Sequence, residues 1–373
     1  MKPLSGLELM KAMRLTRHGR LQEAIAVLGG TASRDGSETA ADVDAAASGL
    51  GLPTPSILPG GLTENWHRMT DAGAAIRTGS QPAGKHLVPV PHGAEFAARQ
   101  FANTAGSRDY KLYVPSRLLG RDLPLVVMLH GCTQSPDDFA LGTRMNDLAE
   151  EAGFLVAYPA QSKAANSSRC WNWFSATDQE RERGEPSLIA GITRAVVAEF
   201  GVDRRRVYVA GLSAGGAQAA IMGAAYPDLF AAIGVHSGLA CGAARDVPSA
   251  FTAMRKGGSP SAAKGAGVPT IAFHGDGDAT VNKVNGDQVI MQAKAGADLT
   301  AEREQGESPG GVAYTRTRFS DENGRARHEH WLLHGAGHAW AGGSSAGTYT
   351  DPRGPDASRE MMRFFLEQDG SAT

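Results

Sequence analysis

This chain has few cysteines and few aromatic residues, and its net charge is small. Its 373 residues include only 3 cysteines, too few for a disulfide scaffold. The 37 Lys and Arg nearly balance the 39 Asp and Glu, and the net charge of −2 gives no indication of binding to nucleic acid or to an anionic membrane surface. No run of about 18 apolar residues occurs, so we expect no membrane-spanning helix.

The start of the chain also lacks the apolar stretch of a signal peptide. Charged residues interrupt the segment MKPLSGLELMKAMRLTRHGRLQEA every few positions. We therefore expect a cytoplasmic protein, and the sequence leaves its oligomeric state open.

Three regions of different character follow one another along the chain. Residues 1–30 repeat apolar side chains at three- and four-residue steps, which predicts an amphipathic helix that ends at a Gly-Gly pair. Residues 31–95 are rich in Ala, Gly, Pro and Ser and predict a flexible linker. Residues 96–373 predict a folded domain. The helix could pack on that domain or on a second chain, or it could dock on a hydrophobic particle.

Apolar runs of strand length alternate with helical patterns in the folded domain. Strands are predicted at 110–114, 124–130, 154–159, 207–211, 231–236, 269–274, 313–319 and 329–333, and helices at 137–152, 186–200, 214–226, 285–295 and 356–368. The central runs are apolar throughout, which is typical of parallel strands covered on both faces. The pattern therefore predicts an α/β fold with a mostly parallel central sheet and helices on both faces.

A serine lies at the junction of a predicted strand and a predicted helix. Residues 211–215 read GLSAG, a G-x-S-x-G box, and they follow a buried strand and precede an Ala-rich helix. Such a sharp turn exposes the serine, and the helix N-terminus favours developing negative charge. We predict that Ser213 is a nucleophile.

A serine nucleophile needs a base and an acid that orients this base. In this kind of fold the acid and then the histidine follow the serine along the chain. We predict that Asp278 is the acid. It lies in the loop after the strand at 269–274, further from the strand than Asp276, which we interpret as a turn residue. We predict that His338 is the base, because it lies in a Gly-rich loop after the strand at 329–333, whereas His334 ends the strand and is interpreted as structural.

Acyl transfer also needs two backbone N–H donors for the oxyanion of the tetrahedral intermediate. One is expected at Ala214, directly after the nucleophile. The other is expected at Cys132, in the loop LHGCTQ that follows the strand at 124–130. The Cys132 thiol is an alternative nucleophile, but it lacks the strand-to-helix turn.

The motifs LHGCTQ, GLSAGG, HGDGDATV and GHAWAGG occur in this order, together with CWNWF at 170–174. Over about residues 108–368 the chain resembles the poly(3-hydroxybutyrate) depolymerase-type esterases of the α/β-hydrolase superfamily. The resemblance implies an α/β-hydrolase fold, a catalytic triad of Ser213, Asp278 and His338, and an oxyanion hole formed by Cys132 and Ala214. It implies hydrolysis through an acyl-enzyme, and we expect no metal or other cofactor.

The resemblance implies two classes of ester substrate. Poly(3-hydroxybutyrate) or its oligomers are expected, and feruloyl or acetylxylan esterase activity is the alternative, because the family includes both. The N-terminal helix and linker resemble the intracellular branch of the family, which implies a polymer granule inside the cell or a soluble oligomer as substrate.

Aromatic residues and two cysteines lie close to these motifs. We interpret Trp173 and Trp340 as walls of a substrate cleft, with core packing as the alternative. The resemblance favours a disulfide between Cys170 and Cys241, whereas a cytoplasmic location favours two buried free thiols.

Two other classes of function remain as alternatives. A metallohydrolase could use His328, His330 and His334, although no H-E-x-x-H motif is present. A binding module without catalysis is the second alternative, because a fold alone does not prove a function.

Overall fold

The computed structural model describes residues 87–117, 122–260 and 267–368. The predicted helix at 1–30 and the linker at 31–95, apart from residues 87–95, lie outside the described residues.

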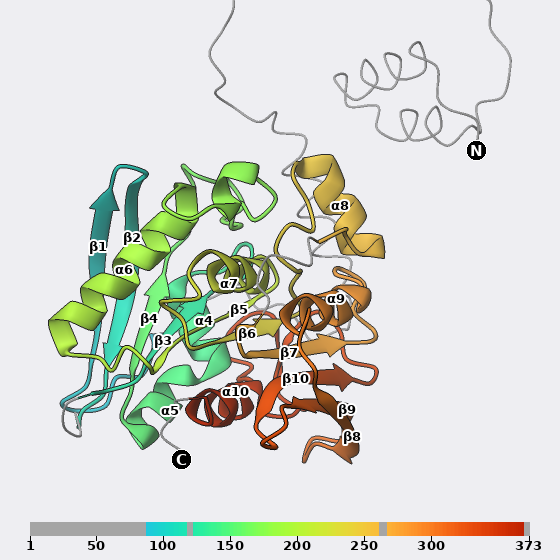
Figure 1. Ribbon diagram of the computed structural model, residues 1–373. Coiled ribbons are helices and arrows are strands. Elements are labelled where there is room, and N and C mark those ends of the chain that lie inside the picture. Colours follow the sequence, from blue (N-terminus) through green and yellow to red (C-terminus); the bar gives the residue numbers. More distant parts are fainter. Residues whose placement is uncertain (1–86, 118–121, 261–266, 369–373) are drawn as a thin grey trace, which may run out of the picture. The chain divides into compact units, whose positions relative to one another are not determined.

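Within the described ranges one sheet of ten strands forms the centre of the domain, in the order β1-β2-β4-β3-β5-β6-β7-β10-β9-β8 (Figure 1). Its strands are β1 Glu95–Asn103, β2 Gly106–Val114, β3 Leu125–Leu129, β4 Leu155–Pro159, β5 Val207–Leu212, β6 Ala232–His236, β7 Thr270–Gly275, β8 Thr300–Glu307, β9 Ala313–Ser320 and β10 Ala326–Leu333. The six strands from β4 to β10 in this order are parallel, and antiparallel strands flank them at both sides.

Helices cover both faces of this sheet (Figure 1). They are α4 Pro136–Thr143, α5 Met145–Ala152, α6 Gly184–Phe200, α7 Ala214–Ala225, α8 Val247–Lys256, α9 Val284–Ala293 and α10 Ala357–Leu366, with a 3₁₀ turn η1 at Ala176–Gln179. Helices α6, α7 and α9 pack on one face, and α5 and α10 pack together on the other. None of the helices in the described part of the chain has the length and apolar character needed to cross a membrane.

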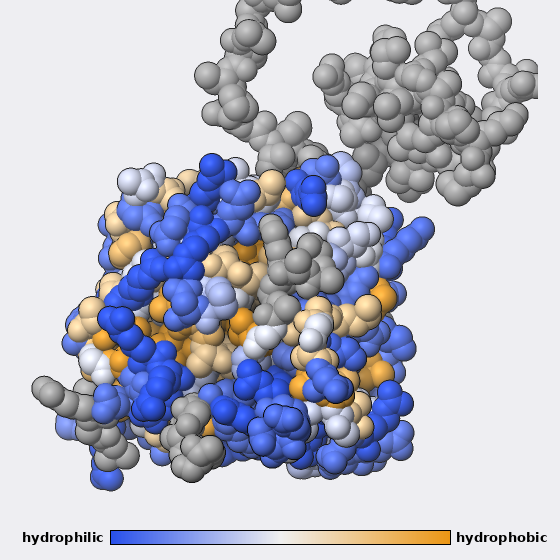
Figure 2. Space-filling model, viewed as in Figure 1, coloured by the Kyte–Doolittle hydropathy of each residue, from blue (hydrophilic) through white to orange (hydrophobic). Residues whose placement is uncertain are grey.

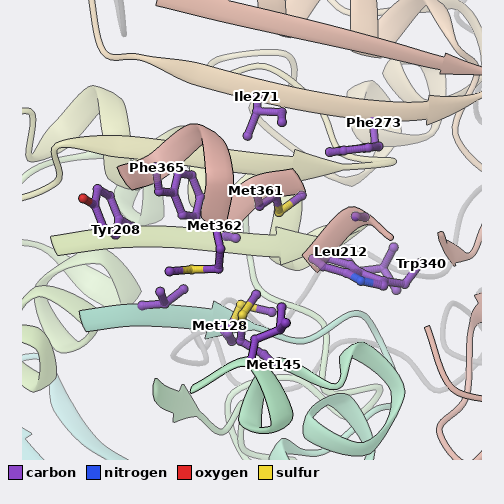
Figure 3. Packing of buried hydrophobic residues seen from close by; sticks show 14 of the residues in the cluster. Met128, Met145, Tyr208, Leu212, Ile271, Phe273, Trp340, Met361, Met362 and Phe365 are labelled. Carbon is purple, nitrogen blue, oxygen red and sulfur yellow. The ribbon is translucent and has the colours of Figure 1, made fainter. Parts of the chain in front are cut away.

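The middle of the sheet is apolar because helices cover it on both faces. Every residue of β3, β4, β5, β6 and β7 is buried. On the α10 side, Met361, Met362 and Phe365 point toward the strands, and Met145 of α5 lies below them (Figure 3). The Phe365 ring stacks on Tyr208 of β5 with centroids 4.8 Å apart. Burial of these side chains holds α10 against the sheet.

The solvent face of α6 contrasts with this core. Figure 2 shows a band of hydrophilic residues along the outer side of α6. The inner side of the helix includes Leu188, Ile189 and Ile192, all buried against the sheet. The helix is therefore amphipathic, as its position over a sheet requires.

The predicted α/β architecture with a mostly parallel sheet is confirmed, and all eight predicted strands are present. The single helix predicted at 137–152 is wrong. Two helices occupy this segment, because Arg144 adopts a left-handed conformation with φ of 56° and ends α4. The carboxyl ends of β3, β5, β7 and β10 lie at one edge of the sheet, and the loops that follow them carry the predicted site residues.

Candidate active site

Ser213 occupies the tight turn between β5 and α7. Its backbone angles are φ 57° and ψ −117°, a strained conformation for a residue with a side chain. A Cβ at Gly211 would overlap the carbonyl of Gly215, and a Cβ at Gly215 would overlap that of Leu129, so glycine is required at both positions. The predicted strand–turn–helix context of Ser213 is confirmed, and its side chain is half-buried.

Asp278 and His338 meet across two loops. The Asp278 Oδ2 lies 2.7 Å from the His338 Nδ1, and their side chains are 0% and 8% exposed. The other oxygen of Asp278 accepts hydrogen bonds from the N–H groups of Thr280 and Val281. These bonds hold the carboxylate in one orientation toward the imidazole.

The charge of Asp278 follows from its surroundings. Burial alone would raise the pKa of this carboxyl, but the charge of His338 and the hydrogen bond from it outweigh burial, so its pKa is lowered. Asp278 is therefore ionised at neutral pH, and it places the His338 Nδ1 proton between the two groups. The Nε2 of His338 has no hydrogen-bond partner within residues 87–117, 122–260 and 267–368.

His236, at the end of β6, connects the serine with the histidine loop. Its carbonyl accepts the N–H of Ser213 at 2.9 Å, and its Nε2 accepts the N–H of Ala341 at 3.0 Å. Burial lowers the pKa of His236 to about 3, and the ring is therefore a neutral acceptor. His236 is not among the predicted site residues. The available signal was a histidine at the end of the strand that pairs with the strand before Ser213.

The proposed oxyanion donors belong to two backbones in close contact. A Cβ at Gly215 would overlap the carbonyl of Leu129, at the end of β3, so the start of α7 packs directly against the loop that contains Cys132. The N–H groups of Cys132 and Ala214 have no acceptor within the part of the chain that the structure describes. Two available donors beside a half-buried serine are what an oxyanion hole requires.

The disulfide predicted between Cys170 and Cys241 is wrong. Cys170 is bonded to Cys132, with the two Cα atoms 4.2 Å apart. The segment before Cys170 lies against the loop after β3, since the N–H of Thr133 donates to the carbonyl of Ser168 at 2.7 Å. Cys241 is buried elsewhere, where the side chain of Gln292 in α9 holds its backbone N–H and carbonyl. Sequence order alone gave no indication of this pairing.

The interpretation of Trp173 and Trp340 as cleft walls is also wrong. Trp340 is fully buried, its ring stacks on His236, and its indole N–H donates to Ser358 of α10 at 3.1 Å. Trp173 is only 2% exposed and packs edge-on against Phe174. Both indoles belong to the core, the alternative that the sequence left open.

Two of the three histidines considered as metal ligands have separate partners. His334 is hydrogen-bonded to Asp276 and Thr315, and His330 lies 3.6 Å from Asp287. His328 is buried, and burial lowers its pKa to about 4. Among the described residues, no group of three or more His, Cys, Asp or Glu side chains is arranged to hold a metal ion.

Comparisons with known proteins place this geometry in a family. The profile described as esterase PHB depolymerase matches residues 108–312, more than half of the chain. Poly(3-hydroxyalkanoate) depolymerase C of Paucimonas lemoignei is 30% identical over 265 residues, which cover 68% of this chain and 61% of that protein. Feruloyl esterase B of Neurospora crassa is 34% identical over 129 residues, which cover 34% of this chain and 43% of that protein.

A solved structure supports the fold. The acetyl xylan esterase from Aspergillus awamori aligns with a TM-score of 0.55 at 21% identity, over 73% of this chain and 99% of that chain. The chain spans less than two thirds of the length of the curated depolymerases, 61% for the Paucimonas lemoignei protein and 48% for the poly(3-hydroxybutyrate) depolymerase of Ralstonia pickettii. The chain has an α/β-hydrolase fold, and it belongs to the esterase PHB depolymerase family.

Proposed function

We propose that this protein is a serine esterase that hydrolyses carboxylic esters through an acyl-enzyme, with poly(3-hydroxybutyrate) or its oligomers as substrate. The observation that carries the proposal is the buried hydrogen bond between Asp278 and His338, together with the strained turn at Ser213, which His236 connects to the loop of His338. Family membership and the depolymerase relatives support the choice of substrate.

In the proposed mechanism His338 acts as the base. Its Nε2 takes the proton of the Ser213 hydroxyl while Oγ attacks the ester carbonyl, and Asp278 stabilises the imidazolium that forms. The oxyanion accepts hydrogen bonds from the N–H groups of Cys132 and Ala214. The imidazolium then protonates the leaving alcohol as the C–O bond breaks. Water, activated by the same imidazole, releases the acid from the acyl-enzyme.

A second candidate substrate class is supported by the comparisons. Feruloyl esterase B of Neurospora crassa and acetylxylan esterase A of Aspergillus ficuum match this chain at 34% and 35% identity. The triad and the oxyanion hole serve either class equally, because both reactions are ester hydrolysis. The two classes differ only in the groups that flank the scissile ester.

Location and polymer contact are further parts of the proposal. The Cys132–Cys170 disulfide is typical of oxidising compartments, which argues against the cytoplasmic location predicted from the sequence. We therefore favour a compartment in which thiols are oxidised. The helix predicted at 1–30 would contact the surface of a polymer particle through its apolar stripe.

A substrate panel tests the proposal. Initial rates are measured for the wild type and Ser213→Ala on 3-hydroxybutyrate oligomers, amorphous polymer granules, methyl ferulate and p-nitrophenyl acetate. Ser213→Ala should lose at least ~10⁴-fold in kcat on every substrate, with an unchanged circular dichroism spectrum. The wild type should have its highest kcat/KM on the oligomers.

Two results would count against it. Near-wild-type turnover by folded Ser213→Ala would remove the serine mechanism. Good turnover of methyl ferulate without any on 3-hydroxybutyrate oligomers would move the protein to the second substrate class.

A further inference from the structure

A buried carboxylate lies behind the loop that contains Cys132. Glu185, in the first turn of α6, is 4% exposed, and three N–H donors point at its two oxygens. Asn172 donates its backbone N–H at 2.8 Å and its side-chain amide at 2.9 Å, and the Gln161 amide is the third donor. The Arg108 guanidinium lies 3.8 Å away and also donates to Gln161. Nothing in the proposed mechanism uses this group directly.

The residues that Glu185 holds are also those that hold the oxyanion loop. The N–H of Gln161 donates to the His130 Nε2 at 3.0 Å, and the indole N–H of Trp171 donates to the His130 carbonyl at 3.0 Å. The Gln161 amide also donates to the carbonyl of Cys170, which is bonded to Cys132. Residues 161–172 therefore connect the carboxylate with the peptide that carries the Cys132 N–H.

The oxyanion loop needs such support because its backbone is strained. Thr133, next to Cys132, has φ of 67°, and Arg169, next to Cys170, has φ of 53°. Left-handed conformations of residues other than glycine cost about 1–2 kcal/mol each, and they persist only where surrounding contacts hold them. The two strained residues flank the disulfide, and Gln161, which donates to Glu185, also donates to the carbonyl of Cys170.

We propose that Glu185 is a positioning residue for the oxyanion hole. Its carboxylate fixes residues 161–172, and this segment in turn orients the Cys132 N–H toward the oxygen of the reacting ester. The inference rests on the proposed esterase function and assigns a role to a residue remote from the serine. A misplacement of about 1 Å in such a donor can cost ~100-fold in rate.

The protonation state of Glu185 agrees with this role. Burial, together with the nearby Asp178 of η1, raises the pKa of Glu185 to about 7, although the hydrogen bonds from Asn172 and Gln161 and the charge of Arg108 oppose the shift. His130 adds no charge, because burial lowers its pKa to about 4. A protonated Glu185 would direct an O–H into a ring of donors and lose one hydrogen bond. Support of the loop is therefore half lost at about pH 7, becomes complete as the pH rises well above that value, and weakens further as the pH falls.

Stability depends on pH in the opposite sense. A carboxyl whose pKa is raised on folding stabilises the fold below its unfolded value of 4.5, and this contribution is lost as the pH rises through about 7. Ionised Glu185 thus weakens the fold in the pH range where it supports the loop. The pH dependence therefore distinguishes the two roles. A positioning role predicts that the effect of Glu185 on kcat grows as the pH rises, whereas a purely structural role does not.

Glu185→Gln tests the proposal, with Glu329→Gln as the matched control. Glu329 is also fully buried and also faces an arginine, Arg363, but it lies on β10 and contacts Trp331 rather than residues 161–172. Both variants leave an arginine without its carboxylate, so both should lower stability. Activity on p-nitrophenyl acetate is measured well below the melting temperature, with Ser213→Ala in parallel.

Glu185→Gln should lower kcat by ~10- to 100-fold with KM changed less than about threefold, and weaken a trifluoromethyl ketone inhibitor in proportion. The ratio of wild-type to variant kcat should rise with pH through about 7, while the same ratio for Glu329→Gln stays flat. Glu185→Asp should recover part of the loss. If Glu185→Gln does not fold, Asn172→Ala should show the same loss of kcat at unchanged KM.

Equal losses in Glu185→Gln and Glu329→Gln, or a pH-independent ratio, would overturn the positioning role while leaving the serine mechanism intact. Full activity in Ser213→Ala would instead remove the proposed function on which the inference rests. The two failures are thus distinguishable in one experiment.

Discussion

Two aspartate–histidine pairs link the loop after β7 with the loop after β10, yet only one has the form of a catalytic pair. Asp278 and His338 are 2.7 Å apart with side chains 0% and 8% exposed, whereas Asp276 and His334 are 3.0 Å apart with side chains 27% and 38% exposed. The second nitrogen of His334 is engaged by Thr315 at 2.9 Å. That of His338 has no partner in the described ranges. Both pairs have a hydrogen bond, so this bond alone does not identify a catalytic base. The buried acid and the available second nitrogen distinguish the Asp278–His338 pair from the structural Asp276–His334 pair.

The largest expected effect comes from removing each histidine in turn. His338→Ala should reduce kcat/KM on p-nitrophenyl acetate by at least ~10⁴-fold, because it removes the proposed base for the serine proton. His334→Ala should change it less than about fivefold, because both of its ring nitrogens are already occupied. Comparable losses in the two variants would show that the pairs act together. Thermal melts of both proteins serve as the control for folding.

The aspartates should show the same ranking with a smaller effect. Asp278→Asn should lower kcat by ~10³- to 10⁴-fold, since the amide no longer favours the required tautomer of His338. Asp276→Asn should remain within about threefold of the wild type. The lowered pKa of Asp278 keeps it ionised, so no acid limb of the wild-type profile above about pH 5 should belong to it. The measurement is the pH profile of kcat for the wild type, Asp278→Asn and Asp276→Asn.

An Asp278→Asn variant with more than about a tenth of wild-type kcat would contradict its assignment as the orienting acid. The same loss in Asp276→Asn would point instead to a shared role of the two acids. Circular dichroism of each variant excludes unfolding as the cause.

The exposed pair should reveal itself in stability. Burial alone would raise the pKa of Asp276, but the hydrogen bonds from His334 and from the Gly335 N–H lower it. A carboxyl with a lowered pKa stabilises the fold above its unfolded value and loses this contribution as the pH falls through its folded value. Asp276→Asn should therefore lower the free energy of unfolding by only ~0.5–1 kcal/mol near pH 7, since solvent screens the pair.

Urea denaturation of the wild type and Asp276→Asn at several pH values from about 6 to 3 measures this difference, which should shrink toward the acid end. A difference that is constant with pH would assign the effect to packing rather than to the ion pair.

Local patterns were sufficient to predict the turn that carries Ser213 and the pairing of Asp278 with His338. Their assignment as one triad stays a prediction. The box at Ser213, its strand and helix, and the order of acid and histidine all lie within short segments of sequence. The partner of Cys170, the contacts of His236 and the network around Glu185 could not be predicted in this way. Each depends on contacts between segments far apart in the chain, and no local spacing encodes them.

The same difference between local patterns and long-range contacts explains which strands were predicted. Buried strands such as β5 were found because they are apolar throughout. Strands β1 and β8 were not predicted. Strand β8 reads TAEREQGE, is exposed along almost its whole length and is defined by its pairing with β9. Its charged side chains are typical of an edge strand that must not pair with another molecule.

The Cys132–Cys170 bond also acts on the unfolded chain. It closes a loop across a sequence separation of 38 residues, which includes α4, α5 and β4. Closure of a loop of this length removes conformational entropy from the unfolded state and, in the chain-entropy model, stabilises the fold by about 4 kcal/mol. A domain of this kind has only ~5–15 kcal/mol of stability in total. One covalent bond thus accounts for a large share of the folding free energy. The same bond holds Cys132, whose N–H would donate to the oxyanion. Reduction of this disulfide by thiols in the surrounding medium would therefore lower both stability and turnover.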